Sequence, residues 1–142
     1  MKRILVALDN SSRAPKVLEA AVRLAELTHS QLVLYRSMTG SPNLPVDLAI
    51  RDDIRIEDLM VLEARTDIER IAAAVPQDMN ENIVTELATP WDGICRTARE
   101  RDVDLIVIGS HGMKGLDHVL GTVAAKVVNH ADRNVLVVRT AR

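Results

Sequence analysis

The chain has 142 residues, a length typical of one domain and too short for two. Hydrophobic residues make up 47% and charged residues 27%, which is the composition of a soluble globular protein and excludes a disordered one. The net charge of −2 argues against a protein that attracts nucleic acid or anionic lipid by its overall electrostatic field. The aromatic residues are one Trp and one Tyr, with no Phe, which argues against a protein that stacks the bases of single-stranded nucleic acid.

The single cysteine, Cys95, excludes an internal disulfide framework and suits a reducing compartment. Lys2 and Arg3 precede an apolar run at 4–8, which resembles the start of a signal peptide. That run is shorter than the ~7–15 apolar residues of a signal peptide and far shorter than the ~20 of a membrane span. We therefore expect residues 1–142 to form one cytoplasmic domain without a membrane segment.

Five short runs rich in Val, Ile and Leu recur along the chain. Most of them lack strict polar alternation, which is typical of strands that are buried on both faces. The predicted strands cover residues 4–8, 31–35, 82–87, 104–108 and 134–138.

Apolar residues at helical spacing lie between these runs and predict four helices. Ser11 and Ser12 are candidates for the N-cap of the first helix, Pro15 suits its first turn, and Pro76 follows the second. The helical patterns cover residues 17–25, 56–75, 91–98 and 120–131.

Strands that alternate with helices predict an α/β fold, with an open parallel sheet covered by helices on both faces. Ligands of such sheets bind beyond the carboxyl ends of the strands, here after Leu8, Tyr35, Leu87 and Ile108. Residues 37–53 have no clear period. We expect a long, mobile loop there that borders the ligand crevice and has room for a short helical piece.

Four of the six glycines, Gly109, Gly112, Gly115 and Gly121, follow the fourth predicted strand. Backbone amides at a helix start, the positive end of the helix dipole and the Thr122 hydroxyl would together form an anion site. The alternative is that the glycines only shape a turn between strand and helix. Neither a Gly-x-Gly-x-x-Gly fingerprint after the first strand nor a P-loop is present.

Four segments carry a resemblance to a known family: ILVALDNS at 4–11, DLIVIGSHG at 104–112, LGTVA at 120–124 and NVLVV at 134–138. On these motifs the chain resembles the universal stress protein family over nearly its whole length. The resemblance implies a five-stranded parallel sheet in the order 3-2-1-4-5, a Rossmann-like fold of the adenine nucleotide α-hydrolase type. It also implies a homodimer.

The ATP-binding branch of that family carries Gly-x2-Gly-x9-Gly-Ser/Thr, and an acidic residue near adenine and ribose. The resemblance implies a nucleotide site formed by Leu8, Asp9, Arg36, Ile108, Gly109, His111, Gly112, Gly121, Thr122 and Val123. Two departures stand against it. Only eight residues, 113–120, separate Gly112 from Gly121, and Tyr35-Arg36 replaces a His followed by a small apolar residue. Arg36 then either blocks the base or adds a phosphate contact.

The leading hypothesis is a stress-response sensor that binds ATP, with Mg²⁺ bridging the phosphates and Thr122 as a contributor. No residue of the motif is an evident general base, so we expect no catalytic residue and at most slow ATP hydrolysis. Asp9 has a second interpretation, as a polar cap at the entry to the first helix. The alternative function is an interaction protein of the same fold that binds no nucleotide and acts through its dimer surfaces.

The strand from Asn134 to Arg139 is expected at an edge of the sheet. An apolar edge strand is an aggregation hazard unless it is paired. Pairing with its twin about a two-fold axis would cover both edges at once, which predicts a homodimer built on this strand.

Overall fold

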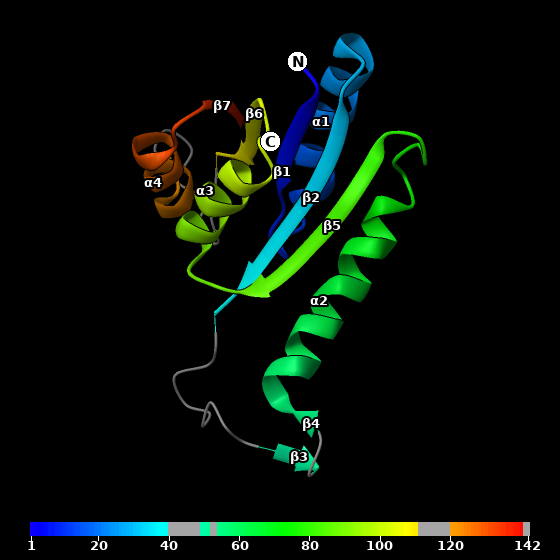
Figure 1. The fold of residues 1–142 in the computed structure, drawn as a ribbon, viewed down its shortest axis with the longest axis vertical. Helices are drawn as coiled ribbons and strands as arrows, with labels where there is room; N and C mark the ends of the chain where they lie inside the picture. The colour runs from blue at the N-terminus through cyan, green and yellow to red at the C-terminus, as the bar shows by residue number, and fades with distance from the viewer. Residues whose placement is uncertain (40–48, 52–53, 111–119, 141–142) are drawn as a thin grey trace.

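The computed structural model describes residues 1–39, 49–51, 54–110 and 120–140. Five parallel strands form one sheet in the order β5-β2-β1-β6-β7 (Figure 1). Counted along the chain among these five, the order is 3-2-1-4-5, which confirms the expected fold class. The strands are β1 (Arg3–Ala7), β2 (Gln31–Met38), β5 (Asn80–Leu87), β6 (Leu105–Gly109) and β7 (Asn134–Val138).

The central strand, β1, is buried on both faces. It pairs with β2 on one side, where Ala7 lies opposite Tyr35, and with β6 on the other, where Val6 lies opposite Val107. Because both pairings are parallel, the carboxyl ends of the three strands lie at the same edge of the sheet. That edge is where an open sheet of this kind binds its ligands.

Two helices cover each face of the sheet (Figure 1). Their bounds are α1 (Ala14–Thr28), α2 (Ile56–Ala72), α3 (Pro90–Glu100) and α4 (Thr122–His130). Val17 of α1 and Ile68 of α2 pack in one apolar cluster, while Ile94 of α3 and Val127 of α4 pack in the other. The core is almost wholly aliphatic, as the composition requires. Within the described ranges, no helix is both long and apolar enough to cross a membrane.

The contact between α3 and α4 includes the only tryptophan of the chain. The rings of Trp91 and His130 have centroids 4.5 Å apart and are tilted by 36°, and the Lys126 Nζ atom lies 5.9 Å from the Trp91 ring centroid. A cation at this distance is attracted by the π-face of the indole. One aromatic side chain therefore joins the two helices at the surface of the second apolar cluster.

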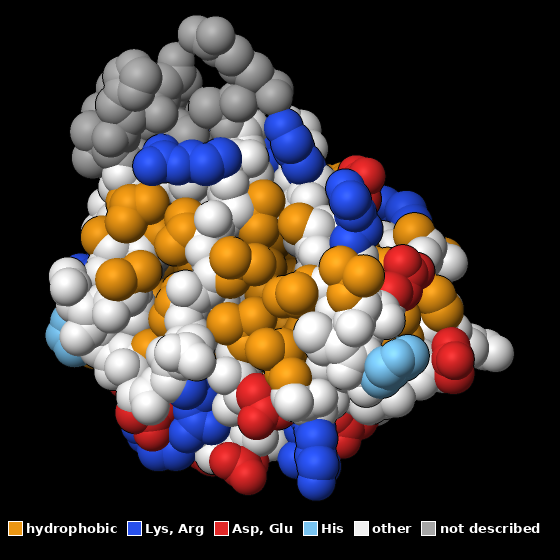
Figure 2. All heavy atoms as spheres, turned by 90° about the horizontal axis from the view of Figure 1, so that it is seen from above, with side chains coloured by type: hydrophobic (Ala, Val, Ile, Leu, Met, Phe, Trp, Pro, Cys, Tyr) orange, Lys and Arg blue, Asp and Glu red, His pale blue; other side chains and the backbone are white. Residues whose placement is uncertain are grey.

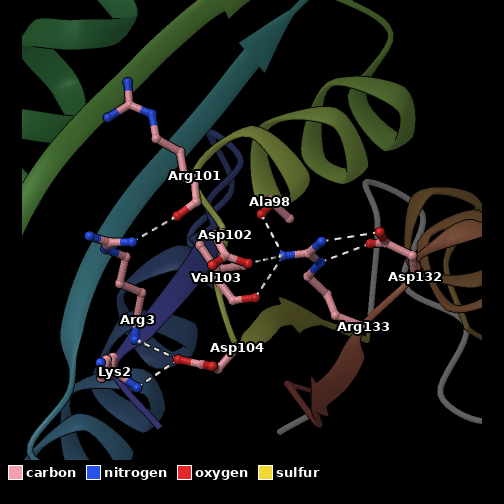
Figure 3. Close-up of polar contacts among 9 residues, drawn as sticks. All are labelled: Lys2, Arg3, Ala98, Arg101, Asp102, Val103, Asp104, Asp132 and Arg133. Atoms are coloured by element: carbon pink, nitrogen blue, oxygen red, sulfur yellow. Dashed lines mark hydrogen bonds and ion pairs between the residues drawn. The ribbon is translucent and has the colours of Figure 1, made fainter.

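At the amino edge of the sheet, Asp104 ties the first residues of β1 to the start of β6 (Figure 3). Its carboxylate accepts hydrogen bonds from the backbone N–H groups of Lys2 at 2.6 Å and Arg3 at 3.0 Å. These bonds, first that from Arg3, hold the pKa of Asp104 below its usual range. The Arg3 guanidinium in turn donates to the Arg101 carbonyl at 3.2 Å, after the end of α3.

Arg133 closes the same edge between α3, β6 and β7 (Figure 3). Its Nη1 atom donates to the carbonyl oxygens of Ala98 at 2.9 Å and Val103 at 2.8 Å. Both carboxylate oxygens of Asp132 accept from the same guanidinium, at 2.8 and 3.1 Å. Arg133, the residue before β7, thus ties the end of α3 to the segment that precedes β6.

The second strand is longer than the sequence predicts. It runs on through Arg36 to Met38 because β5 is long enough to pair with it there, with Arg36 opposite Thr85 and Met38 opposite Leu87. The expectation of a loop from residue 37 is therefore wrong at its start. Near its end, β3 (Ala49–Arg51) pairs antiparallel with β4 (Ile54–Arg55). The remainder of the expected loop lies outside the described residues.

The entry to α1 also differs in detail from the prediction. The helix begins at Ala14 with Arg13 in the N-cap position, and Arg13 makes no side-chain cap bond. Ser11, the expected cap, acts just before the helix: its hydroxyl accepts from the Arg13 N–H at 3.2 Å and its carbonyl accepts from the Ala14 N–H at 3.2 Å. Pro15 lies in the first turn as expected.

A polar cluster crosses from the end of β2 to α3. The buried Tyr35 hydroxyl donates to Glu86 Oε2 at 2.6 Å, and Arg96 of α3 forms an ion pair with the same oxygen. Burial, reinforced by Glu86, raises the pKa of Tyr35 well above its usual range. Gly93 makes room for this hydroxyl, because a Cβ atom there would lie 2.0 Å from it.

We expect Asp104→Ala to lower the free energy of unfolding by about 1–2 kcal/mol near neutral pH, because two charge-assisted hydrogen bonds at an exposed carboxylate are lost. The pKa of Asp104 is lower in the folded state, so its contribution is complete above the ordinary value of 3.8 and disappears as the pH falls through the folded value. Urea unfolding at about pH 7 and about pH 3 measures both effects. Asp78→Ala, at an exposed acid, is the control; a wild-type advantage that is undiminished in acid would contradict the assignment.

Gly93→Ala is expected to destabilise the fold by about 1–3 kcal/mol, because the new methyl group displaces the Tyr35 hydroxyl from Glu86. The gain of ~0.5–1 kcal/mol from replacing glycine within a helix is smaller than this cost. In a Tyr35→Phe background the same substitution should cost clearly less, since the hydroxyl that it meets is gone. A double-mutant cycle of unfolding free energies measures the coupling, and additive effects would show that the clash is relieved elsewhere.

Candidate functional site

The carboxyl end of β1 presents Leu8 and Asp9. Leu8 is buried, and its N–H continues the pairing with β2 by donating to the Tyr35 carbonyl at 2.8 Å. Asp9 is exposed, and its Oδ1 atom accepts from the Ser11 N–H at 3.0 Å and the Ser11 hydroxyl at 2.6 Å. The Asp9 carboxylate therefore holds the turn that leads into α1, which agrees with its interpretation as a polar cap at the helix entry. This turn lies at the carboxyl edge of the sheet.

The carboxyl end of β6 lies beside that of β1 and presents Ile108 and Gly109. Ile108 is buried in the cluster under α3 and α4. Gly109 faces the opposite side, where a Cβ atom would come within 3.0 Å of Val17 Cγ2. Close packing of α1 against β6 thus accounts for this glycine.

Ser110 connects the end of β6 to the start of α4 and was not identified from the sequence. It has no exposed surface. Its N–H donates to the Val138 carbonyl at 2.8 Å, its carbonyl accepts from the Gly121 N–H at 2.8 Å, and its hydroxyl accepts from the Thr140 N–H at 3.3 Å. A hydroxyl directly after an apolar strand that ends in a glycine was the available signal for this role.

The hydrogen bond between Ser110 and Gly121 fixes the position of the first turn of α4. Gly121 occupies the N-cap position with φ −58° and ψ 158°, which other residues also adopt, and it provides no side-chain cap. Thr122 is exposed and Val123 is partly buried. The amide groups of a first turn have no partner within the helix and lie at the positive end of its dipole. This turn is thus an electropositive group of donors beside the end of β6.

Arg36 lies next to the end of β1 but is largely withdrawn from solvent, with 5% of its surface exposed. Its Nη2 atom donates to the Asp9 carbonyl at 2.7 Å and its Nε atom to the Leu8 carbonyl at 3.4 Å. The Nη1 atom lies 3.5 Å from Asp67 Oδ2 on α2. The guanidinium therefore points toward the backbone of β1 and toward α2.

The expected site residues thus meet at adjacent strand ends: Leu8 and Asp9 after β1, Arg36 on the extension of β2, and Ile108 and Gly109 on β6. Ser110 adds the start of α4 to this edge. The expected site residues His111 and Gly112 lie outside the described residues. Among the residues whose side chains the structure describes, no three His, Cys, Asp or Glu are grouped to hold a metal ion.

A family model and several known proteins match this chain. The model of the universal stress protein family matches residues 1–139. Universal stress protein Sll1388 of Synechocystis sp. is 31% identical, over 96% of this chain and 97% of that protein.

Two solved structures show the same fold. A universal stress protein of Archaeoglobus fulgidus in complex with dAMP has a TM-score of 0.59 and 27% identity, over 96% of this chain and 97% of that chain. A universal stress protein in complex with cAMP has a TM-score of 0.68 and 21% identity, over 99% and 98%. The match of the family model to almost the entire sequence, together with a sheet in the expected order, shows that the chain belongs to the universal stress protein family.

Proposed function

We propose that this protein binds an adenine nucleotide at the carboxyl ends of β1 and β6, and that it acts as a stress-response sensor or regulator. The observation that carries the proposal is the first turn of α4, whose N-cap has no side-chain bond and which Ser110 anchors beside the end of β6. Such a turn is suited to a phosphate group. The family members with bound dAMP and cAMP support the choice of adenine nucleotides.

Each end of the nucleotide has a proposed set of partners. Thr122 and Val123 would donate backbone N–H groups to the phosphates, with Gly109, His111, Gly112 and Gly121 completing the loop; the Gly121 N–H itself stays bonded to the Ser110 carbonyl. Leu8 and Ile108 would line the base. Both bonds of the Asp9 carboxylate to Ser11 use Oδ1, so we assign Oδ2 to the ribose hydroxyls.

We further propose that ATP is the preferred nucleotide and that Mg²⁺ enters with its phosphates. The exposed Thr122 hydroxyl is the protein oxygen best placed to add to the coordination of that ion. Mg²⁺ keeps several waters and often relies on phosphate oxygens, so a single protein ligand suffices. The described part of the site provides no histidine or lysine against the first turn of α4 that would activate water, so hydrolysis of ATP should be slow or absent.

Thr122→Asp separates the effect on binding from the effect on folding. An acid at the first position of α4 should leave stability unchanged or raise it by ~0.3–1 kcal/mol, because it complements the helix dipole. The same charge should repel the phosphates and weaken binding at least about tenfold, or ~1.4 kcal/mol. Calorimetric titration with ATP and Mg²⁺, and with dAMP, measures the loss.

The matched control is Asn129→Asp, which adds the same charge near the other end of the same helix. Nucleotide affinity should be unchanged in this variant. Equal losses in both variants would indicate a general charge effect and contradict a phosphate site at the first turn. Wild-type protein that takes up neither ATP nor dAMP would overturn the proposed function and favour the alternative below.

A second candidate function is protein interaction without a nucleotide. The observations that favour it are the engagement of Asp9 with Ser11 and the buried guanidinium at the end of β1. Both occupy polar groups that a nucleotide would otherwise contact. In this case the surfaces of a dimer would carry the function.

For either function we propose a homodimer that forms through β7. This strand pairs only with β6 in the described sheet, and Leu136 is 40% exposed on it. β7 lies near the top of Figure 1, and Figure 2, which views the molecule from above, shows hydrophobic side chains gathered at the centre with charged groups around them. A second β7 would pair with the open edge and cover Leu136.

Leu136→Lys should convert the dimer to a monomer, because a charge on an edge strand opposes pairing with another strand. Sedimentation equilibrium at micromolar concentration gives the mass of each variant. Val128→Lys, at an exposed apolar residue of α4, is the matched control and should stay dimeric. Monomeric wild-type protein under these conditions would refute the interface.

A further inference from the structure

Arg36 lies where β2 extends beyond the last pair of its ladder with β1. The ladder ends with Ala7 opposite Tyr35, and Leu8 adds one more hydrogen bond to the Tyr35 carbonyl. Arg36 is thus the first residue of β2 beside the connection that leaves β1. Its neighbour on the other side is Thr85 of β5, so its backbone is held within the sheet.

The side chain of Arg36 belongs to the face of the sheet that α1 and α2 cover. Side chains alternate along a strand, and Leu34, two residues earlier, packs in the cluster with α1 and α2. The ion pair with Asp67 of α2 agrees with this placement. A nucleotide whose phosphates lie at α4 binds on the side of the other cluster, which includes α3 and α4. Arg36 is therefore not placed to contact the phosphates.

The Arg36 guanidinium binds the backbone of the proposed site rather than a ligand position. It donates to the carbonyl oxygens of Leu8 and Asp9, and the second of these bonds is short at 2.7 Å. The carboxylate of Asp9 is bound at the same time by Ser11. Asp9 is therefore restrained at both its carbonyl and its carboxylate, which fixes the direction of its remaining oxygen.

Asp67 provides the carboxylate for this buried cation. A charge in a site of low exposure is costly unless it is paired, and Arg36 is 5% exposed. The Asp67 side chain is 42% exposed and also pairs with Arg70 at 3.1 Å through its other oxygen. A continuous polar path thus runs from the surface of α2 through Arg36 to Asp9 and on to the start of α1.

We propose that Arg36 is a positioning residue: it fixes Asp9 for the nucleotide, and Asp67 couples α2 to the site through it. This inference rests on the proposed function for its effect on binding, whereas its effect on the Asp9 turn is independent of any nucleotide. It differs from both roles that the sequence left open for Arg36, because the side chain neither blocks the base nor touches a phosphate. Specificity then depends on a residue that does not contact the ligand.

The test compares Arg36→Met, Arg36→Lys and Asp67→Asn with the control Arg70→Met. The Arg70 side chain is 75% exposed and pairs with the other oxygen of Asp67, within α2. Two readouts are used: the affinity for ATP with Mg²⁺, and the hydrogen exchange rate of the Ser11 amide, which Asp9 protects in the free protein. Urea unfolding confirms that each variant folds.

Arg36→Met should weaken ATP binding about tenfold, or ~1.4 kcal/mol, and should speed exchange at Ser11 by a similar factor. Arg36→Lys should recover part of both, since an ammonium group can still donate to one carbonyl but cannot reproduce the planar fork. Asp67→Asn should shift both readouts in the same direction and less. In the Arg36→Met background Asp67→Asn should add nothing, which is the sign of a shared path. Arg70→Met should change neither readout.

Unchanged exchange at Ser11 in folded Arg36→Met would overturn this inference by itself, whether or not the protein binds ATP. Tighter binding of ATP by that variant would also overturn it and would show that Arg36 obstructs the base. Wild-type protein without affinity for ATP or dAMP would refute the proposed function and the binding half of this inference. Accelerated exchange in Arg36→Met would then still support the restraint of Asp9. Failure of the two proposals is therefore distinguishable.

Discussion

The pairing of β1 on both sides in parallel is the constraint on which the rest of this structure depends. A strand that is buried on both faces and hydrogen-bonded on both edges has no freedom of register. The register of β2 and β6 relative to β1 is therefore fixed. As a result, the polar residues that follow these three strands lie together at one edge of the sheet. The opposite edge collects the starts of the strands, where Asp104 and Arg133 join segments distant in the sequence.

Several residues at the carboxyl edge serve the fold and the proposed site together. Gly109 allows α1 to pack against β6, Ser110 anchors α4, and Asp9 shapes the entry to α1. A substitution at these positions therefore changes packing as well as any ligand contact. The first turn of α4 is different, because Thr122 is exposed and its replacement leaves the core intact. This contrast determines which residues can report on binding alone.

The sequence predicted the strands well because a two-sided sheet selects continuous apolar runs, and the runs at 4–8 and 104–108 each contain all but one residue of β1 and of β6. It failed at the end of β2, since Arg36 and Ser37 are polar and resemble a loop; their pairing with β5 depends on a partner about fifty residues away. The order of the strands came from the resemblance, because periodicity does not determine neighbours.

The sequence predicted the location of the candidate site, but not most of the contacts that its side chains make. The edge follows from the alternation of strands and helices, whereas the bonds of Arg36 to two carbonyls depend on side-chain direction. The reason for Gly109 was likewise hidden, since the sequence cannot show that Val17 lies 3.0 Å from where a Cβ would be. Tertiary packing, rather than local chemistry, determines both.

The placement of Trp91 gives the protein an unusual optical property. The single tryptophan lies between α3 and α4, so tryptophan fluorescence does not report on most of the interior. Emission from the indole instead senses its two neighbours on α4, the His130 ring and the Lys126 ammonium. Separation of α4 from α3 would alter the spectrum while β1, β2 and β5 stay assembled. The emission of Trp91 thus reports locally on the helix that begins at the proposed phosphate site.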